Sequence, residues 1–226
     1  MKTRTLLATA VMMAAFGALA KQPVDTGHGG AVATISHEAS LAAMEILSAG
    51  GNAIDAAVAA AATLGVTDPF SCGIGGGGFM LIYSARDKRV IALDHREVAP
   101  ASFHPGVFLG TDGKAMDWKA TVPNGLAVGV PGTVRGWHEA LTRYGTMGFE
   151  AVLAPAIRVA EAGFSVGPNF PRISKVNEAK FARFSTASAL YLKDGQALPV
   201  GTHFRNPDMA QTYRDLARGG VKAFYE

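Results

Sequence analysis

A single cysteine, Cys72, stands among the 226 residues, so no disulfide can form within the chain. This excludes the small disulfide-rich scaffolds that many exported domains use. We interpret Cys72 as a small buried residue rather than a nucleophile, because no histidine near it in the sequence would activate its thiol. A partner that is distant in the sequence but close in the fold stays open.

Charged residues are also scarce, at 17% of the chain, whereas hydrophobic residues make up 49%. A chain of this length and composition buries a sizeable core, which argues against disorder. The formal net charge is +3, and two of the basic residues, Lys2 and Arg4, lie at the very start. No basic cluster remains beyond them, so nucleic acid is not an expected partner.

No apolar run is long enough to span a membrane, which takes about 20 residues. The run at Leu6–Ala20 follows two basic residues and ends in an A-x-A sequence, Ala18–Ala20. This pattern predicts a signal peptide over residues 1–20. We therefore expect residues 21–226 to be exported to the periplasm or secreted, with no membrane span.

Familiar catalytic and metal-binding patterns are missing as well. The six histidines form no H-E-x-x-H pair, and one cysteine allows no C-x-x-C. There is no G-x-S-x-G elbow, and no Ser-His-Asp set can be argued from chain order alone. The residues therefore predict no metal site, and we assign no catalytic residue.

Apolar periodicity and turn residues predict a mixture of helices and strands. Helices are expected over 37–48, from Asn52 onward, over 133–144, over 149–162 with a bend or restart at Pro155, and over 207–219, with helical turns around 173–184. Strands are expected over 30–36, 79–85, 89–94 and 125–132, the middle two as a hairpin. Residues 101–125 are predicted to be a long surface excursion.

Glycine, by contrast, is abundant, and four in a row, Gly75–Gly78, separate the second helix from the hairpin. Residues 73–78 match the letters G-x-G-x-x-G, but a dinucleotide site needs a strand before the glycines and a helix after them. The order here is reversed, so no nucleotide cofactor is predicted. Two alternatives stay open: a neighbouring element or a ligand lies against bare main chain, or the glycines form a tight turn without a ligand.

Arg96, in the sequence DHREVAP, is the candidate binding residue. It follows the strand 89–94, which is predicted to be buried, and a guanidinium at a strand end suits bidentate capture of a carboxylate. An internal ion pair with Asp94 or Glu97 accounts for the residue equally well. The residues alone leave this choice open.

Several ordered segments resemble the large subunit of γ-glutamyltransferase, also called γ-glutamyltranspeptidase or glutathione hydrolase. They are GGNAIDAAVAAAATLGVTDPFSCGIGGGGFMLIY, ALDHREVAP, PNGLAVGVPGTVRGWHEALTRYG and LAPAIRVAEAGFSV, and the similarity runs from about Gly27 to the last residue. Cys72 departs from the family pattern, in which a small residue such as serine is more common.

The resemblance implies an α+β fold, the αββα sandwich of the N-terminal-nucleophile hydrolases. It implies a precursor that cuts itself into two subunits, a nucleophilic threonine at the start of the small subunit, and no metal or organic cofactor. That threonine attacks the γ-glutamyl amide of glutathione or a similar donor, and water, an amino acid or a peptide then takes the acyl group. The family's R-E-x-A-P arginine, which binds the donor's α-carboxylate, corresponds to Arg96, and we expect Arg96 to share an opening with the glycine run.

Family members are more than twice as long as this chain. We therefore expect it to end inside the large subunit, to lack the nucleophile, and to be inactive and poorly stable alone, with apolar faces exposed. Relatives of the same fold, the cephalosporin (glutaryl) acylases and the poly-γ-glutamate processing enzymes, are alternative functions. An exported, non-enzymatic binding protein is the alternative of a different class.

Overall fold

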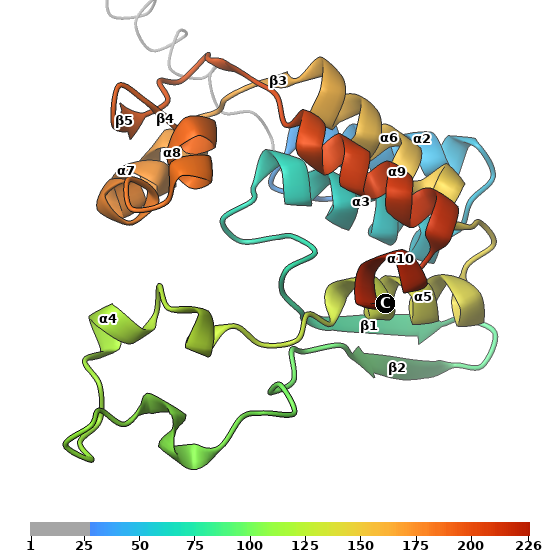
Figure 1. Cartoon of the computed structure of the whole chain (residues 1–226). Coiled ribbons are helices and arrows are strands. Elements are labelled where there is room, and N and C mark those ends of the chain that lie inside the picture. Colours follow the sequence, from blue (N-terminus) through green and yellow to red (C-terminus); the bar gives the residue numbers. More distant parts are fainter. Residues whose placement is uncertain (1–27) are drawn as a thin grey trace, which may run out of the picture. The chain divides into compact units, whose positions relative to one another are not determined.

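The computed structural model describes residues 28–226, which belong to two units. The first unit ends at Ala31, and the second comprises Val32–Glu226. The signal peptide predicted at 1–20 lies outside the described residues. All helices and strands named below belong to the second unit (Figure 1).

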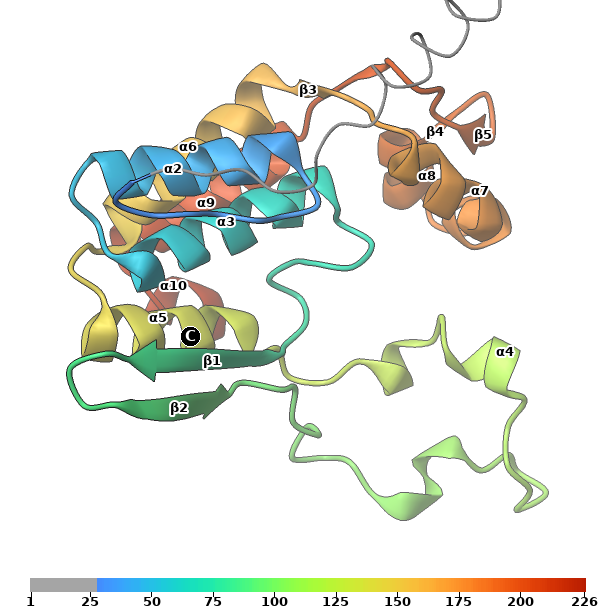
Figure 2. The same cartoon turned by 180° about the vertical axis from the view of Figure 1, so that it is seen from behind.

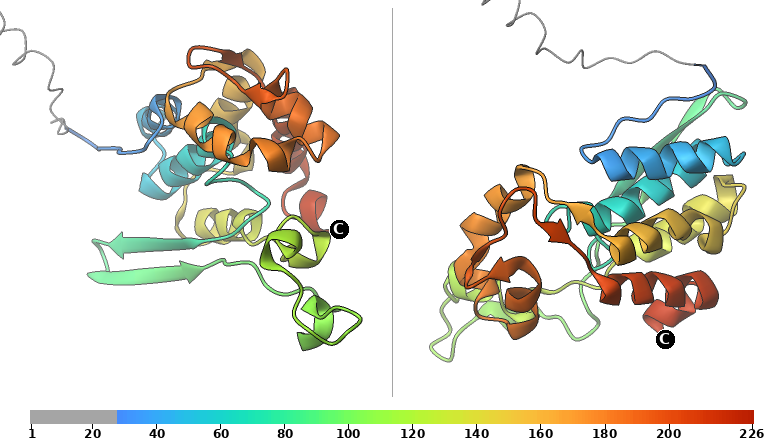
Figure 3. Two further views of the ribbon diagram at one scale, coloured as in Figure 1. Left: turned by 90° about the vertical axis from the view of Figure 1, so that its left-hand side faces the viewer. Right: turned by 90° about the horizontal axis from the view of Figure 1, so that it is seen from above.

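Four helices pack side by side into one layer (Figures 1 and 3). They are α2 (His37–Ser48), α3 (Ala53–Thr67), α6 (Phe149–Ala162) and α9 (Pro207–Gly219). The central one, α3, contacts both α2 and α6, and most of its residues are buried. A helix that is apolar on most sides needs neighbours on most sides, and its many alanines allow those neighbours to approach closely. The helix expected from Asn52 onward is thus confirmed, and it lies at the centre of the layer.

The ends of α2 and α3 are capped by residues that lie next to them in the sequence. The Ser36 side chain accepts a hydrogen bond from the Ala39 N–H at 3.3 Å, and Gly50, with a left-handed φ of 91°, lies just after the end of the helix. The Asn52 side chain caps α3 and forms a capping box with Asp55. Both helices therefore begin where local chemistry places them.

Asp55 also joins α3 to the loop between α5 (Thr133–Tyr144) and α6. Its carboxylate is fully buried and accepts hydrogen bonds from the Asn52 N–H at 2.8 Å, the Thr146 N–H at 2.9 Å, the Thr146 hydroxyl at 2.6 Å and the Met147 N–H at 3.1 Å. Burial by itself raises the pKa of the Asp55 carboxyl, but the hydrogen bonds outweigh it and hold the pKa below its ordinary value. One carboxylate thus fixes the spacing of three helices.

A β-hairpin lies next to α5 (Figure 2). Its strands, β1 (Phe79–Ser84) and β2 (Arg89–Asp94), pair antiparallel from Phe79 opposite Asp94 to Ser84 opposite Arg89. This confirms the predicted hairpin. Ile82 points into the protein, whereas Phe79, Leu81, Tyr83 and Val90 are each more than 60% exposed.

The prediction that strand 89–94 is buried is therefore wrong. Alternate residues of a strand face opposite sides, and among residues 28–226 only one side of the hairpin is covered. The expectation of exposed apolar faces is confirmed at this hairpin.

Two further strand predictions are wrong, because a strand needs a hydrogen-bonded neighbour and not only β-forming residues. Residues 30–36 form no strand, and they pair with no other segment that the structure describes. Residues 125–132 contain a 3₁₀ turn, η2 (Gly125–Ala127), and a single bridge between Val130 and Val98. The α6 helix also continues through Pro155 without restarting.

Residues 101–125 form the predicted excursion, with a 3₁₀ turn, η1 (Pro105–Phe108), an isolated bridge between Leu109 and Ala115, and a short helix, α4 (Trp118–Thr121). After α6 come α7 (Asn169–Phe181), α8 (Ser185–Tyr191), α10 (Lys222–Tyr225) and the two-residue strands β3 (Phe164–Ser165), β4 (Leu192–Lys193), β5 (Gln196–Ala197) and β6 (His203–Phe204). Among residues 28–226, no helix combines the length and hydropathy that crossing a bilayer requires.

Replacing the buried carboxylate, Asp55→Asn, should lower the free energy of unfolding at pH 7 by about 2–4 kcal/mol, because an amide cannot accept all these hydrogen bonds. The folded-state pKa of Asp55 is depressed, so its contribution is present above about pH 4 and is lost as the pH falls through the folded value. Urea denaturation at pH 7 and at pH 3 measures both effects.

The matched control is Asp112→Asn, at a mostly exposed carboxylate whose Oδ2 lies 3.8 Å from the Lys114 Nζ and whose Oδ1 accepts from the Lys114 N–H at 3.0 Å. It should change the free energy of unfolding by less than about 0.5 kcal/mol. Equal losses for the two variants, or a loss at Asp55 that does not shrink in acid, would contradict the assignment.

Candidate functional site

The three residues that follow β2, His95–Glu97, lie against the glycine run Gly75–Gly78. The Gly78 N–H donates to the His95 carbonyl at 3.2 Å, and the His95 N–H donates to the Gly78 carbonyl at 3.0 Å. The hairpin ladder thus extends by one pair beyond the strands. It brings the DHRE sequence and the tetraglycine sequence together, although they are some twenty residues apart in the chain.

Two glycines leave room for this segment, and we call Gly77 and Gly132 the glycine clamp. A Cβ atom at Gly77 would collide with the His95 carbonyl oxygen and lie 2.8 Å from the Arg96 Cα. A Cβ atom at Gly132 would collide with the same oxygen and lie 2.9 Å from the Arg96 carbonyl oxygen. Any larger residue at either position therefore displaces the main chain that carries Arg96.

The Gly76 carbonyl oxygen connects the glycine run to the first turn of α5. It accepts hydrogen bonds from the Gly132 N–H at 2.9 Å, the Thr133 N–H at 3.0 Å and the Thr133 hydroxyl at 3.0 Å. Because this oxygen holds both parts of the clamp together, the distance between Gly77 and Gly132 is fixed by the main chain.

The glycine run also faces a carboxylate of the protein itself, that of Glu97. A Cβ atom at Gly76 would lie 3.3 Å from the Glu97 Oε1. Hydrogen bonding from its own N–H, the charge of Arg96 and the Gly77 N–H hold the pKa of the Glu97 carboxyl below its ordinary value, against the opposing effect of desolvation. Of the two alternatives for the run, the structure supports close packing against a neighbouring element, which is the segment His95–Glu97.

Arg96 forms one of the two ion pairs considered from the sequence. Its Nε lies 3.2 Å from the Glu97 Oε2, whereas Asp94 accepts a hydrogen bond from the Arg96 backbone N–H at 3.0 Å. The side chain is 62% exposed, so this pair contributes little to stability. The other four N–H groups of the guanidinium, on Nη1 and Nη2, have no hydrogen-bond partner within residues 28–226. The ion pair and a binding role therefore coexist.

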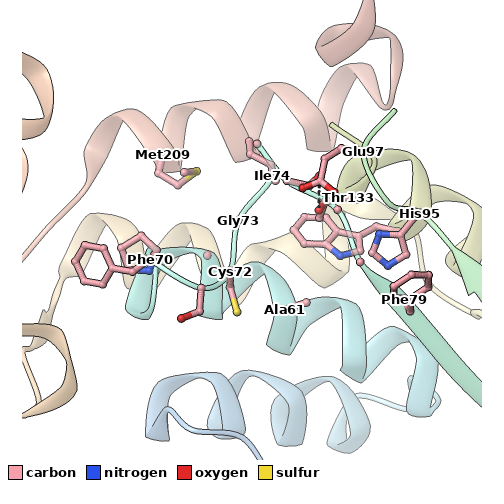
Figure 4. Close-up of a pocket in the computed structure, with 18 of the residues that line it drawn as sticks. Ala61, Phe70, Cys72, Gly73, Ile74, Phe79, His95, Glu97, Thr133 and Met209 are labelled. Atoms are coloured by element: carbon pink, nitrogen blue, oxygen red, sulfur yellow. Dashed lines mark hydrogen bonds between the residues drawn. The ribbon is translucent and has the colours of Figure 1, made fainter. Parts of the chain in front are cut away.

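Two cavities adjoin the segment. The first, of about 570 Å³, is lined by the glycine run, Cys72, His95 and Glu97 (Figure 4). The second, of about 600 Å³, lies between β2, α5 and α10 and is lined by Arg96, His95, Arg135, Arg143, Glu139 and Tyr225, among others. The expectation that Arg96 and the glycine run share one opening is therefore wrong. They line different cavities, although the Arg96 Cζ lies 5.9 Å from the centroid of the Phe79 ring, which lines the first one.

His95, which lines both cavities, is a residue that sequence reasoning missed. Its ring packs so closely on Gly136 that a Cβ atom there would lie 2.7 Å from the His95 Cδ2. Its Nδ1 is buried and has no hydrogen-bond partner in the described part of the chain. The only signal in the sequence was its position next to Arg96.

Cys72 is half-buried at the edge of the first cavity, where Figure 4 shows it beside Phe70. Burial, assisted by the charge of Asp68, raises the pKa of the Cys72 thiol. A raised pKa means less thiolate, which supports the interpretation of a packing residue. Across residues 28–226, no three side chains of His, Cys, Asp or Glu gather in a way that could hold a metal ion.

Comparison with known proteins gives consistent matches over nearly the whole chain. The family described as Gamma-glutamyltranspeptidase matches residues 39–226. The glutathione hydrolase proenzyme of Bacillus subtilis is 40% identical over 203 residues, which cover 90% of this chain and 34% of that relative. The chain thus spans about a third of the length of the curated relatives it matches.

Solved structures agree with the sequence matches. The γ-glutamyltranspeptidase of Helicobacter pylori superposes with a TM-score of 0.84 at 34% identity, covering 90% of this chain and 58% of that one. The γ-glutamyltranspeptidase of Pseudomonas nitroreducens superposes with a TM-score of 0.79 at 37% identity, covering 89% and 58%.

The raised thiol pKa predicts slow alkylation of Cys72. At pH 8, iodoacetamide should react more slowly with the folded protein than with the same protein in denaturant, because the raised pKa leaves less thiolate. Asp68→Asn should increase the folded-state rate, and Asp112→Asn should leave it unchanged. Mass spectrometry of quenched samples measures the rates, and a folded protein that reacts as fast as the unfolded one would instead indicate an activated thiol.

Proposed function

The chain belongs to the γ-glutamyltranspeptidase family, and we propose that it is part of an enzyme that cleaves glutathione and related γ-glutamyl amides. Its fold is the N-terminal-nucleophile hydrolase fold predicted from the sequence. Within this chain, the position of the Arg96 guanidinium supports the proposal. Its guanidinium is exposed at the mouth of a cavity and has four N–H groups available.

The proposed role of Arg96 is to bind the α-carboxylate of the donor. A guanidinium presents two edges to a carboxylate, one formed by Nε and one Nη and the other by both Nη groups. Glu97 accepts from Nε, which keeps the plane of the guanidinium oriented. The edge formed by Nη1 and Nη2 is then left for two parallel hydrogen bonds to a ligand carboxylate.

Binding the α-carboxylate contributes to catalysis because it orients the donor. In a γ-glutamyl donor the carboxylate is separated from the scissile amide by three carbon atoms, so holding one end restricts where the γ-carbonyl carbon can lie. The donor then loses its translational and rotational freedom when it binds, so less entropy is lost on reaching the transition state. The contribution proposed for Arg96 is thus to fix the position of the donor.

We propose that the remaining chemistry comes from the part of the precursor that lies outside the third of its relatives' length that this chain spans. The relatives are named proenzymes, and we propose that the attacking hydroxyl comes from a small subunit cut from the same precursor. Its oxygen forms an ester with the γ-carbonyl carbon. The bond from that carbon to the amide nitrogen breaks, and this nitrogen leaves as an amine after taking up the proton of the hydroxyl. Water or an amino group then attacks the ester and restores the hydroxyl. Export by a signal peptide at residues 1–20, with residues 21–226 in the mature protein, belongs to the same proposal.

The direct test is Arg96→Lys in the full-length protein, assayed with a γ-glutamyl anilide. One ammonium cannot form two parallel hydrogen bonds, so the donor KM should rise by roughly 10- to 100-fold. Arg86→Lys is the matched control, because Arg86 is an exposed arginine of the same hairpin, paired with Asp87 at 3.4 Å. A donor KM that is the same in Arg96→Lys and Arg86→Lys would refute the role of Arg96.

A further inference from the structure

Arg96 lies on a short exposed segment, and its side chain has two partners among the described residues: the Glu97 carboxylate and the Phe79 ring, whose centroid lies 5.9 Å from the Arg96 Cζ. Glu97 belongs to the same segment as Arg96, so the main chain of 95–97 carries both the guanidinium and the carboxylate that orients it. We propose that Gly77 and Gly132, the glycine clamp, are positioning residues that set the recognition of the donor carboxylate by Arg96. This inference rests on the proposed function, since it concerns the same carboxylate.

Space, rather than backbone conformation, is what makes glycine necessary at these two positions. Gly132 has φ −107° and ψ −15°, which any residue can adopt, and Gly77 has no left-handed φ either. A Cβ atom at each would nevertheless meet carbonyl, Cα or amide atoms of residues 95–97. Those are main-chain atoms, so no rotation of a side chain can relieve the collision.

Hydrogen bonds on both sides of Arg96 prevent the segment from moving away. Before it, His95 pairs with Gly78 through bonds of 3.0 and 3.2 Å, and after it Val98 pairs with Val130 through bonds of 2.8 and 3.3 Å. The glycine run and α5 cannot separate easily, because the Gly76 carbonyl accepts from both Gly132 and Thr133. An added methyl group must therefore shift Arg96 itself.

Such a shift matters more for recognition than for folding. Two parallel hydrogen bonds require the guanidinium to lie within about 0.5 Å and 10–20° of the productive position. A displacement of about 1 Å at a positioning group can reduce the rate by about 100-fold. Donor recognition should therefore respond to a single methyl group at Gly77 although that residue has no contact with the Arg96 guanidinium.

The glycine run contains its own series of controls. A Cβ atom at Gly75 meets nothing within 4 Å, one at Gly76 meets only the Glu97 Oε1 at 3.3 Å, and one at Gly77 meets the main chain of 95–97. None of these three glycines has a left-handed φ. Alanine substitutions at 75, 76 and 77 thus add the same methyl group at three neighbouring positions. The expected displacement of Arg96 increases from 75 to 77.

The experiment compares two donors in the full-length protein. One is γ-glutamyl p-nitroanilide, and the other is 4-aminobutanoyl p-nitroanilide, which keeps the amide and the amine but lacks the carboxylate. The ratio of their kcat/KM values measures recognition of the carboxylate. Gly75→Ala should leave this ratio within about twofold of the original protein, and Gly76→Ala should lower it about 2- to 5-fold below that of Gly75→Ala. Gly77→Ala should lower it about 10-fold or more, mainly through the KM of the first donor.

Arg96→Lys distinguishes failure of this inference from failure of the proposed function. If Arg96→Lys leaves the ratio unchanged, the proposed function is wrong at Arg96. If Arg96→Lys lowers the ratio and Gly77→Ala does not, the positioning inference alone is overturned. A lower melting temperature of Gly77→Ala with an unchanged ratio would also overturn the positioning inference, because Gly77 would then contribute to stability but not to recognition of the carboxylate.

If Gly77→Ala prevents the full-length protein from folding, the test moves to Gly76→Ala, whose methyl group meets only a side-chain oxygen. There the expected result is a ratio about 2- to 5-fold below that of Gly75→Ala, because Glu97 shifts and with it the hydrogen bond to the Arg96 Nε. A ratio equal to that of Gly75→Ala would overturn the inference.

Discussion

The main chain of His95 and Arg96 passes so close to Gly77 and Gly132 that neither position has room for a Cβ atom. This close approach connects parts of the protein that are far apart in the sequence. The glycine run follows α3 of the helical layer, residues 95–97 continue the hairpin, and Gly132 precedes α5. Main-chain hydrogen bonds to Gly76 and Gly78 hold these segments together. The site thus depends on backbone packing that only glycine permits.

Two carboxylates support this arrangement in different ways. Asp55 is buried and binds the loop that follows α5, so it fixes where α5 lies against α3. Glu97 is near the surface, lies over the glycine run and occupies the Nε side of Arg96. The first acts on the framework of the protein, and the second acts on the orientation of one guanidinium. Together they leave the Nη edge of Arg96 available for the carboxylate of a ligand.

The elements that the sequence predicted correctly are those set by local chemistry. Ser36, Asn52 and the Asn206-Pro207 pair mark helix starts through hydrogen bonds within a few residues, and all three helices begin there. The strand at 30–36 was predicted wrongly, because strand formation depends on a partner that no local pattern supplies. Arg96 was identified as a candidate, but no local pattern indicated that it and the glycine run line different cavities. The close approach of Gly132 and the burial of the His95 Nδ1 also arise from contacts distant in the sequence.

A crystal structure of the full-length protein with bound L-glutamate tests most directly whether Arg96 binds the α-carboxylate. The account predicts that the α-carboxylate of glutamate accepts hydrogen bonds from both Nη atoms of Arg96 while Nε stays bonded to Glu97. It also predicts that the main chain of 95–97 remains in contact with Gly77 and Gly132. A carboxylate bound away from Arg96, or an Arg96 main chain that has left the two glycines in order to reach it, would contradict the account.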